Sequence, residues 1–187
     1  VYAQAIHWIT VTRINTKFPW CLFKMHHLAD DFLTIGANLH HTATAFNELL
    51  LVLTEMGLPT APSKTVHPCF KLEYLGLILD TREMVVAMPM DKRTRMSTTL
   101  TSMVFEPKWG VKPTQSIVGK LHFTHACYSE FFPLVARFHS RLAPAVRDGS
   151  HSLWPTNELR QSCKTLAAVI NSNPKGNLRH YGRTYDQ

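Results

Sequence analysis

Apolar residues recur at helical spacing in two segments of the N-terminal half, which predicts one helix over residues 2–14 and another over residues 39–53. In the second segment the apolar positions step by four, three, four and three, and Gly57 follows as a C-terminal stop. The two predicted faces consist of Tyr2, Ala5, Ile6 and Ile9, and of Leu39, Ala43, Phe46, Leu50 and Leu53.

Between these helices two short apolar stretches flank an acidic doublet. Residues 20–28 predict one strand, and residues 32–36 resume the apolar pattern up to Gly36. Asp30 and Asp31 interrupt the two stretches, so the sequence predicts a β hairpin with two carboxylates at its tip.

A second strand pair is predicted after the loop that contains Pro59 and Pro62. Residues 70–79 alternate and then run apolar, which predicts a strand. Residues 80–83 are polar enough to turn the chain, and residues 84–88 would return as the partner strand.

From Pro89 onward the pattern predicts only helices. Asp91 is a candidate N-cap for a helix to about Val104, and Thr114 is a candidate cap for a helix that holds Ile117, Val118 and Leu121. A third helix carries Phe131, Val135, Phe138 and Leu142, and a fourth, opened by Thr156, carries Leu159, Cys163, Leu166 and Ile170. Pro144, Gly149 and Pro155 mark a linker between them, and residues 171–187 form a polar tail expected to be poorly ordered. This order predicts an α+β domain followed by a helical one.

Composition adds a preference for polyanionic partners. The chain has 187 residues and a formal net charge of +7, with 20 Lys and Arg against 13 Asp and Glu. Nucleic acid is therefore a plausible partner, although a chain of this charge can equally bind none. No apolar run reaches the roughly 18 residues that a membrane helix needs, so no membrane partner is expected.

The cysteines and histidines predict no clear metal site. Cys21, Cys69, Cys127 and Cys163 lie far apart, which indicates neither a disulfide framework nor a zinc ribbon and favours an intracellular setting of undetermined compartment. His122, His125 and Cys127 are close in sequence, but a further ligand with finger-like spacing is missing. Ordinary histidines on a helix surface are the simpler interpretation.

The acidic doublet is the strongest candidate for chemistry. Adjacent carboxylates raise each other's pKa unless a cation neutralises them, and Mg²⁺ prefers carboxylate and phosphate oxygens. Asp30 and Asp31 could therefore hold ions for phosphoryl transfer. On the dipeptide alone, a solvated Asp-Asp turn is the better interpretation.

The surroundings of the doublet resemble those of reverse transcriptases, and are closest to retroelements of the DIRS and Ngaro type. The resemblance covers about residues 1–170. The segments that carry it are His27-Leu28-Ala29-Asp30-Asp31-Phe32-Leu33, Met56-Gly57-Leu58-Pro59-Thr60-Ala61-Pro62-Ser63-Lys64-Thr65, Glu73-Tyr74-Leu75-Gly76-Leu77-Ile78-Leu79-Asp80 and Ser116-Ile117-Val118-Gly119-Lys120-Leu121-His122-Phe123.

The resemblance implies a role for several residues. Asp30 would be the metal-binding carboxylate with Asp31 as its neighbour, and Lys64 would protonate the leaving pyrophosphate, unless it is simply a loop lysine facing water. Tyr74, Leu75 and Gly76 would contact the primer, or else form a plain core strand. Lys92, Arg93 and Arg95 could follow a phosphate backbone, although a charged helix face usually meets only solvent.

The resemblance also implies an architecture and partners. It divides the chain into a partial palm of antiparallel hairpins packed on helices (1–89), an all-helical thumb (90–146), and a linker with a helix toward a connection region (147–187). The complete enzyme would use two Mg²⁺ ions, an RNA template, a DNA primer, N-terminal fingers and palm, and a downstream RNase H region.

Two departures limit the activity expected of this chain. Leu28 replaces the usual aromatic residue of the motif, and no Asp or Glu precedes Asp30 to complete a two-metal site. We therefore expect the family's missing acid to lie upstream of Val1 and the chain alone to be inactive. The alternatives are a non-catalytic nucleic-acid-binding remnant and a decayed retroelement product.

Overall fold

The computed structural model describes residues 2–123, 127, 132–172 and 175–177 of the chain. Helices alternate with small antiparallel sheets in the first half, and helices dominate the second, which confirms the predicted α+β class. The chain divides into two compact units, residues 1–72 and residues 73–187. No helix among the described residues combines the length and apolar character needed to cross a membrane.

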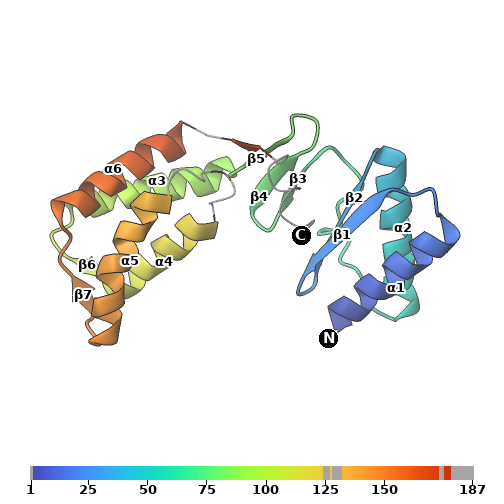
Figure 1. Ribbon diagram of the computed structural model, residues 1–187, viewed down its shortest axis with the longest axis horizontal. Coiled ribbons are helices and arrows are strands. Elements are labelled where there is room, and N and C mark those ends of the chain that lie inside the picture. Colours follow the sequence, from blue (N-terminus) through green and yellow to red (C-terminus); the bar gives the residue numbers. More distant parts are fainter. Residues whose placement is uncertain (1, 124–126, 128–131, 173–174, 178–187) are drawn as a thin grey trace. The chain divides into compact units, whose positions relative to one another are not determined.

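The first unit is a β hairpin packed against two helices. Helix α1 spans Tyr2–Lys17, strands β1 and β2 span Phe23–Leu28 and Asp31–Gly36, and helix α2 spans Leu39–Glu55. Both helices pack against the hairpin and against each other (Figure 1). Its buried apolar residues are Ile6, Met25, Leu49 and Val52 in one cluster and Ile14, Cys21 and Ala45 in another.

Helix α2 has a capping motif at each end. At its start the Asn38 side chain accepts a hydrogen bond from the His41 N–H at 3.0 Å, as an N-cap does. At its end Gly57 adopts φ +70°, its N–H bonds to the Thr54 carbonyl, and the Leu58 N–H bonds to the Leu53 carbonyl. These two bonds form a Schellman motif, so the stop predicted at Gly57 is confirmed.

The second unit begins with a small sheet. Strands β3 (Lys71–Tyr74), β4 (Leu77–Asp80), β5 (Val85–Ala87) and β8 (Gly176–Asn177) lie in that order, with β5 antiparallel to both β4 and β8. The predicted single strand over residues 70–79 is wrong, because the chain reverses at Leu75 and Gly76. Both residues have positive φ, at 49° and 80°, which is the backbone of a two-residue type I′ hairpin turn.

The sheet packs on the helices that follow it. Leu77, Leu79, Val86 and Met88 contact the helical core, so this hairpin belongs to the second compact unit. The sequence interpretation had grouped it with residues 1–89.

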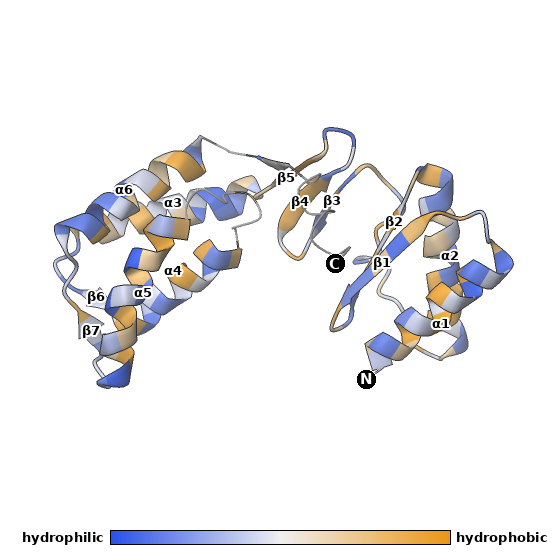
Figure 2. Ribbon diagram, in the orientation of Figure 1, coloured by the Kyte–Doolittle hydropathy of each residue, from blue (hydrophilic) through white to orange (hydrophobic). Residues whose placement is uncertain are grey.

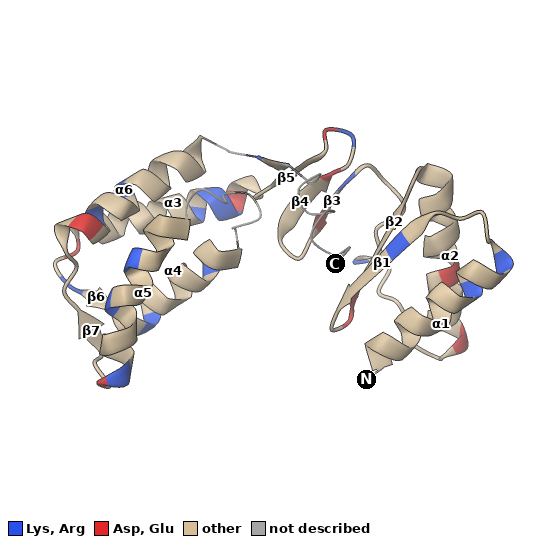
Figure 3. Ribbon diagram, in the orientation of Figure 1, with Lys and Arg blue, Asp and Glu red and all other residues tan. Residues whose placement is uncertain are grey.

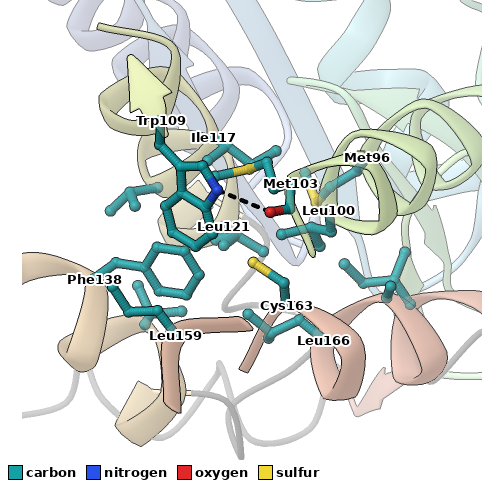
Figure 4. Close-up of a cluster of buried hydrophobic side chains, with 14 of the residues drawn as sticks. Met96, Leu100, Met103, Trp109, Ile117, Leu121, Phe138, Leu159, Cys163 and Leu166 are labelled. Carbon is teal, nitrogen blue, oxygen red and sulfur yellow. Dashed lines mark hydrogen bonds between the residues drawn. The ribbon is translucent and has the colours of Figure 1, made fainter. Parts of the chain in front are cut away.

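Four helices and a short strand pair complete the second unit. The helices are α3 (Met90–Phe105), α4 (Val111–Phe123), α5 (Phe132–Arg147) and α6 (Asn157–Asn171), and the strands are β6 (Trp109–Gly110) and β7 (Ser152–Leu153). Figure 2 shows apolar stretches on the sides of these helices that face their neighbours. Trp109 lies at the centre of their core, 1% exposed, and its indole N–H donates to the Met103 carbonyl at 2.8 Å (Figure 4).

Three predicted helix boundaries are wrong. Helix α4 begins at Val111, so Thr114 lies inside it and its buried hydroxyl donates to the Gly110 carbonyl at 2.8 Å. Helix α3 is preceded by Pro89, and Asp91 in its first turn instead bonds Arg95. Helix α5 continues through Pro144. The proline removes only one N–H donor, and the Asp148 N–H bonds to the Pro144 carbonyl in the next turn. The predicted cap at Thr156 is confirmed, since its hydroxyl accepts from the Leu159 N–H.

Candidate functional site

The acidic doublet lies at the tip of the first hairpin, as the sequence predicts. Strands β1 and β2 pair antiparallel with Leu28 opposite Asp31, which leaves Ala29 and Asp30 as the two-residue turn. The tight turn requires positive φ at its first residue, and Ala29 adopts φ +53° there although it has a Cβ. Both aspartates are exposed, and they form the acidic tip visible in Figure 3.

The pairing register determines which way the hairpin residues face. Met25 is buried among the residues of α1 and α2, so its alternate neighbour His27 and the opposing Phe32 also lie on the helix side. Leu28 and Asp31 therefore lie on the opposite, outer face, where Leu28 is 58% exposed. Leu28 thus presents an apolar surface beside the Asp31 carboxylate.

A histidine pair supports the stem of the hairpin just below the tip. The Nδ1 atoms of His7 on α1 and His27 on β1 are 3.0 Å apart, and the His27 ring stacks on Phe32. Burial, with the neighbouring His27 and His26 as smaller causes, lowers the pKa of His7 from its ordinary value. The stem is therefore tied to α1 by a contact that favours neutral imidazole.

The hairpin tip presents two exposed carboxylates, the type of ligand that divalent metals bind. Two carboxylates can contribute oxygens to Mg²⁺, which usually binds one or two protein carboxylates and several waters. Within the described residues no group of three potential metal ligands assembles, so the residues present fit one side of a metal centre.

Lys64 lies in an exposed turn after α2. Its backbone N–H bonds to the Ala61 carbonyl at 2.9 Å, and Thr65 bonds to the same carbonyl. The role of Lys64 in catalysis stays a prediction.

The second unit contains a cleft of about 580 Å³ between the β3–β4 turn and the first two helices of the bundle. It brings together four residues predicted as primer or phosphate contacts: Leu75, Gly76, Lys92 and Arg95. It also adds residues that the sequence interpretation did not assign to a site, among them Ser116, Gly119, Lys120 and Phe123 of α4. Their spacing of three, four and seven residues marks one helical face, which is the signal that could have identified them.

The cleft has two paired cations and a further lysine. Lys92 lies 2.6 Å from the Glu73 carboxylate, and Arg95 lies 2.5 Å from that of Asp91. The hydrogen bond from Arg95 is the main reason that the pKa of Asp91 is lowered. These acids reduce the positive charge of the α3 side. Lys120 on α4 adds a further cation to the cleft lining, and Figure 3 shows basic residues on both α3 and α4.

Gly76 is required by both the turn and the cleft. Its φ of +80° is strained for a residue with a Cβ, and an added Cβ would lie 2.7 Å from the Lys92 Nζ atom. The glycine therefore lets a lysine side chain lie directly against the backbone of the turn.

Two predicted contact residues do not line this cleft. Tyr74 is partly buried in β3, and Arg93 is partly buried on α3 with its Nε atom lacking a hydrogen-bond partner in the described structure. The cleft therefore brings together four of the six predicted primer and phosphate contacts, beside the β3–β4 turn.

The sequence neighbours His122, His125 and Cys127, for which surface histidines were the preferred interpretation, are only partly covered by the described residues. His125 lies outside the described residues. Cys127 is buried, and burial raises the pKa of its thiol to about 11, which disfavours the thiolate that binds metals. His122 instead contacts His139 of α5, which the sequence interpretation did not single out.

Comparisons of the chain with protein-family models, curated proteins and solved structures gave no match.

Proposed function

We propose that this chain is the palm and thumb portion of a reverse transcriptase, which in the complete protein transfers nucleotides to a primer 3′-hydroxyl on an RNA template. The observation that carries the proposal is the exposed Asp30-Asp31 doublet at a two-residue hairpin tip on two packed helices. The apolar pattern on both sides of the doublet predicted this hairpin, and its place between the other family-like segments supports the proposal.

In this proposal the carboxylates at the tip bind the catalytic metal ions. Asp31 begins β2, so its backbone is fixed by the pairing with Leu28, whereas Asp30 belongs to the turn itself. When bound, two Mg²⁺ ions would activate the primer hydroxyl and stabilise the departing pyrophosphate. The chain's contribution is to present both carboxylates on a hairpin whose stem is tied to α1 by the histidine pair.

The cleft supports a second part of the same proposal, the contact with the primer strand. Leu75 and Gly76 offer backbone groups at a tight turn, and Lys92, Arg95 and Lys120 offer charges that suit phosphates. Tyr74 and Arg93 would act from just outside the cleft. Because Lys92 and Arg95 already have acidic partners, phosphate would have to compete with Glu73 and Asp91.

The metal assignment can be tested on the chain itself with Mn²⁺ in place of Mg²⁺. We expect paramagnetic broadening of NMR signals centred on residues 28–33, and loss of that broadening in Asp30→Asn and Asp31→Asn. Asp148→Asn, which removes an exposed loop carboxylate from the second unit, is the matched control and should leave the broadening unchanged. Broadening that is absent from the tip, or unaffected by both tip variants, would refute the metal role.

A catalytic assay complements this measurement. We expect the purified chain to extend no primer on an RNA template, because one carboxylate pair supplies only part of a two-metal site. Magnesium-dependent extension that disappears in Asp30→Ala would contradict the expected inactivity.

A non-catalytic nucleic-acid-binding protein is the second candidate, and the cations of the cleft favour it. Both candidates predict binding to an RNA–DNA hybrid that weakens as salt rises, and that weakens further in Lys92→Ala and Lys120→Ala. Only the reverse transcriptase proposal also predicts Mn²⁺ at the hairpin tip. A chain without affinity for the hybrid at low salt would count against both and leave the decayed product as the remaining interpretation.

A further inference from the structure

Two exposed histidines from different helices of the second unit face each other through their ring nitrogens. The Nε2 atoms of His122 on α4 and His139 on α5 are 2.5 Å apart, and the ring centroids are 4.8 Å apart. Two neutral imidazoles can share one proton here if one ring donates and the other accepts. The same convergence of nitrogen lone pairs is what a chelated transition metal requires.

The two nitrogens lie closer together than those of a metal-bound pair, so the rings must separate slightly to admit a metal. Zinc binds imidazole nitrogen at about 2.0–2.1 Å, so two such ligands at a tetrahedral angle have their nitrogens about 3.3 Å apart. From 2.5 Å, rotations about the side-chain bonds of two exposed residues can supply the remaining separation without moving either helix. The T-shaped contact between the rings of His122 and Phe132 orients one of the two ligands.

The surroundings suit a partly hydrated cation. Among the described residues, the positions one turn away from each histidine on its own helix are uncharged. They are Val118 and Gly119 beside His122, and Val135, Ala136, Leu142 and Ala143 beside His139. No lysine or arginine therefore occupies these described positions. Both histidines are exposed, which leaves the remaining coordination positions open to water.

A second histidine pair among the described residues, His7 and His27, lacks this access. His7 is partly buried and its contact with His27 lies against the Phe32 ring, next to the core of the first unit. A metal there would have to complete its coordination shell among apolar residues. The exposed pair on α4 and α5 is therefore the better metal site.

We propose that His122 and His139 chelate a divalent transition metal such as Zn²⁺ or Cu²⁺, with water in the remaining positions, and so link α4 to α5. Imidazole ligands select these ions over Mg²⁺, which separates this site from the carboxylates at the hairpin tip. The proposal is independent of the function proposed above, because it requires neither nucleic acid nor catalysis.

Calorimetric titration of the whole chain with Zn²⁺ tests the proposal. We expect His122→Ala and His139→Ala each to weaken the strongest binding step by at least about tenfold, since even loss of a second-shell partner commonly costs 10–100-fold in metal affinity. The double variant should bind no more weakly than either single variant, because either substitution already destroys the chelate. His151→Ala removes an exposed histidine from a loop of the same unit and should change nothing.

A second measurement guards against a misfolded variant. Saturating Zn²⁺ should raise the melting temperature of the wild type and of His151→Ala, and should leave those of His122→Ala and His139→Ala unchanged. Each variant's melting temperature without metal shows whether it folds. Zn²⁺ affinity that survives in either single variant, or losses that simply add in the double variant, would overturn the proposed chelate.

Discussion

The two units hold their hairpins in different ways. In the first unit the β1–β2 hairpin rests on a small core, and a nearly buried carboxylate, Glu48 of α2, bonds Lys17 at 2.8 Å and lies 3.7 Å from Arg13. In the second unit the β3–β4–β5 sheet is attached to a large apolar core centred on Trp109. The first unit thus combines small apolar clusters with a nearly buried carboxylate that pairs with cations, whereas the second is built on one large apolar core.

Their tight turns differ as well. The β1–β2 turn puts Ala29, a residue with a Cβ, at positive φ, whereas the β3–β4 turn has Leu75 and then Gly76 there. At the first tip the turn displays carboxylates, and at the second the missing Cβ lets Lys92 approach the backbone. Two-residue turns that differ in backbone conformation thus present carboxylates in one hairpin and accommodate a lysine in the other.

The largest expected effect comes from removing the centre of the apolar core. Trp109→Ala should lower the free energy of unfolding of the second unit by about 3–5 kcal/mol, because it leaves a large cavity and an unpaired Met103 carbonyl. Urea unfolding followed by circular dichroism measures the loss. Trp154→Ala is the control, since this side chain is 71% exposed and should change stability by less than about 0.5 kcal/mol. Equal losses in the two variants would contradict the packing described.

Next in size is the charge network of the first unit. Glu48→Gln should cost about 1–3 kcal/mol, because the buried carboxylate loses its charge while Lys17 and Arg13 stay beside it. Glu55→Gln removes a carboxylate that also pairs with Arg13 but is 45% exposed, and should cost less than Glu48→Gln. Chemical denaturation of both variants measures the difference. If Glu48→Gln were as mild as Glu55→Gln, the buried network would not be central to this unit.

The two turns give a prediction of opposite sign. Ala29→Gly should raise the free energy of unfolding by up to about 1 kcal/mol, because glycine adopts positive φ without steric strain. Gly76→Ala should lower it by about 1–2 kcal/mol, because it adds that strain and brings a Cβ to 2.7 Å from the Lys92 Nζ atom. Thermal melts of the two variants decide the matter, and a shift of the same sign in both would break the comparison.

The hairpins also show how far sequence reasoning reaches. Asp30 and Asp31 could be placed at a tip because two polar residues interrupt two apolar stretches that are otherwise continuous. The reversal at Leu75 and Gly76 was missed, because apolar residues continue through it and conceal the turn. Strands β6 and β7 are two residues each and depend on pairing between distant segments, so no local pattern announces them.

Side-chain contacts between distant residues account for the rest. Thr114 matches an N-cap by residue type, yet its hydroxyl bonds the Gly110 carbonyl inside a helix. The contact of His122 with His139 joins two helices, and the cleft depends on how α4 packs beside the β3–β4 turn. Periodicity identifies the apolar face of a helix, but it does not identify the helix or strand against which that face packs.

The smallest expected effect concerns the histidine pair that ties the first hairpin to α1. Because the pKa of His7 is lowered in the folded protein, chiefly by burial, the unfolded chain binds its proton more readily. The contribution of neutral His7 to the free energy of unfolding should therefore be fully present above the ordinary histidine pKa of 6.5. It should be lost as the pH falls from there through the lowered pKa of His7. In His7→Gln, which keeps a polar side chain but cannot titrate, urea unfolding at pH 7.5 and at pH 5.5 should show a smaller loss on acidification than in wild type. His40→Gln, in an exposed histidine of the same unit that stacks on Trp20, is the control and should retain the wild-type difference. Identical pH dependence in wild type and His7→Gln would mean that the contact with His27 does not require a neutral ring.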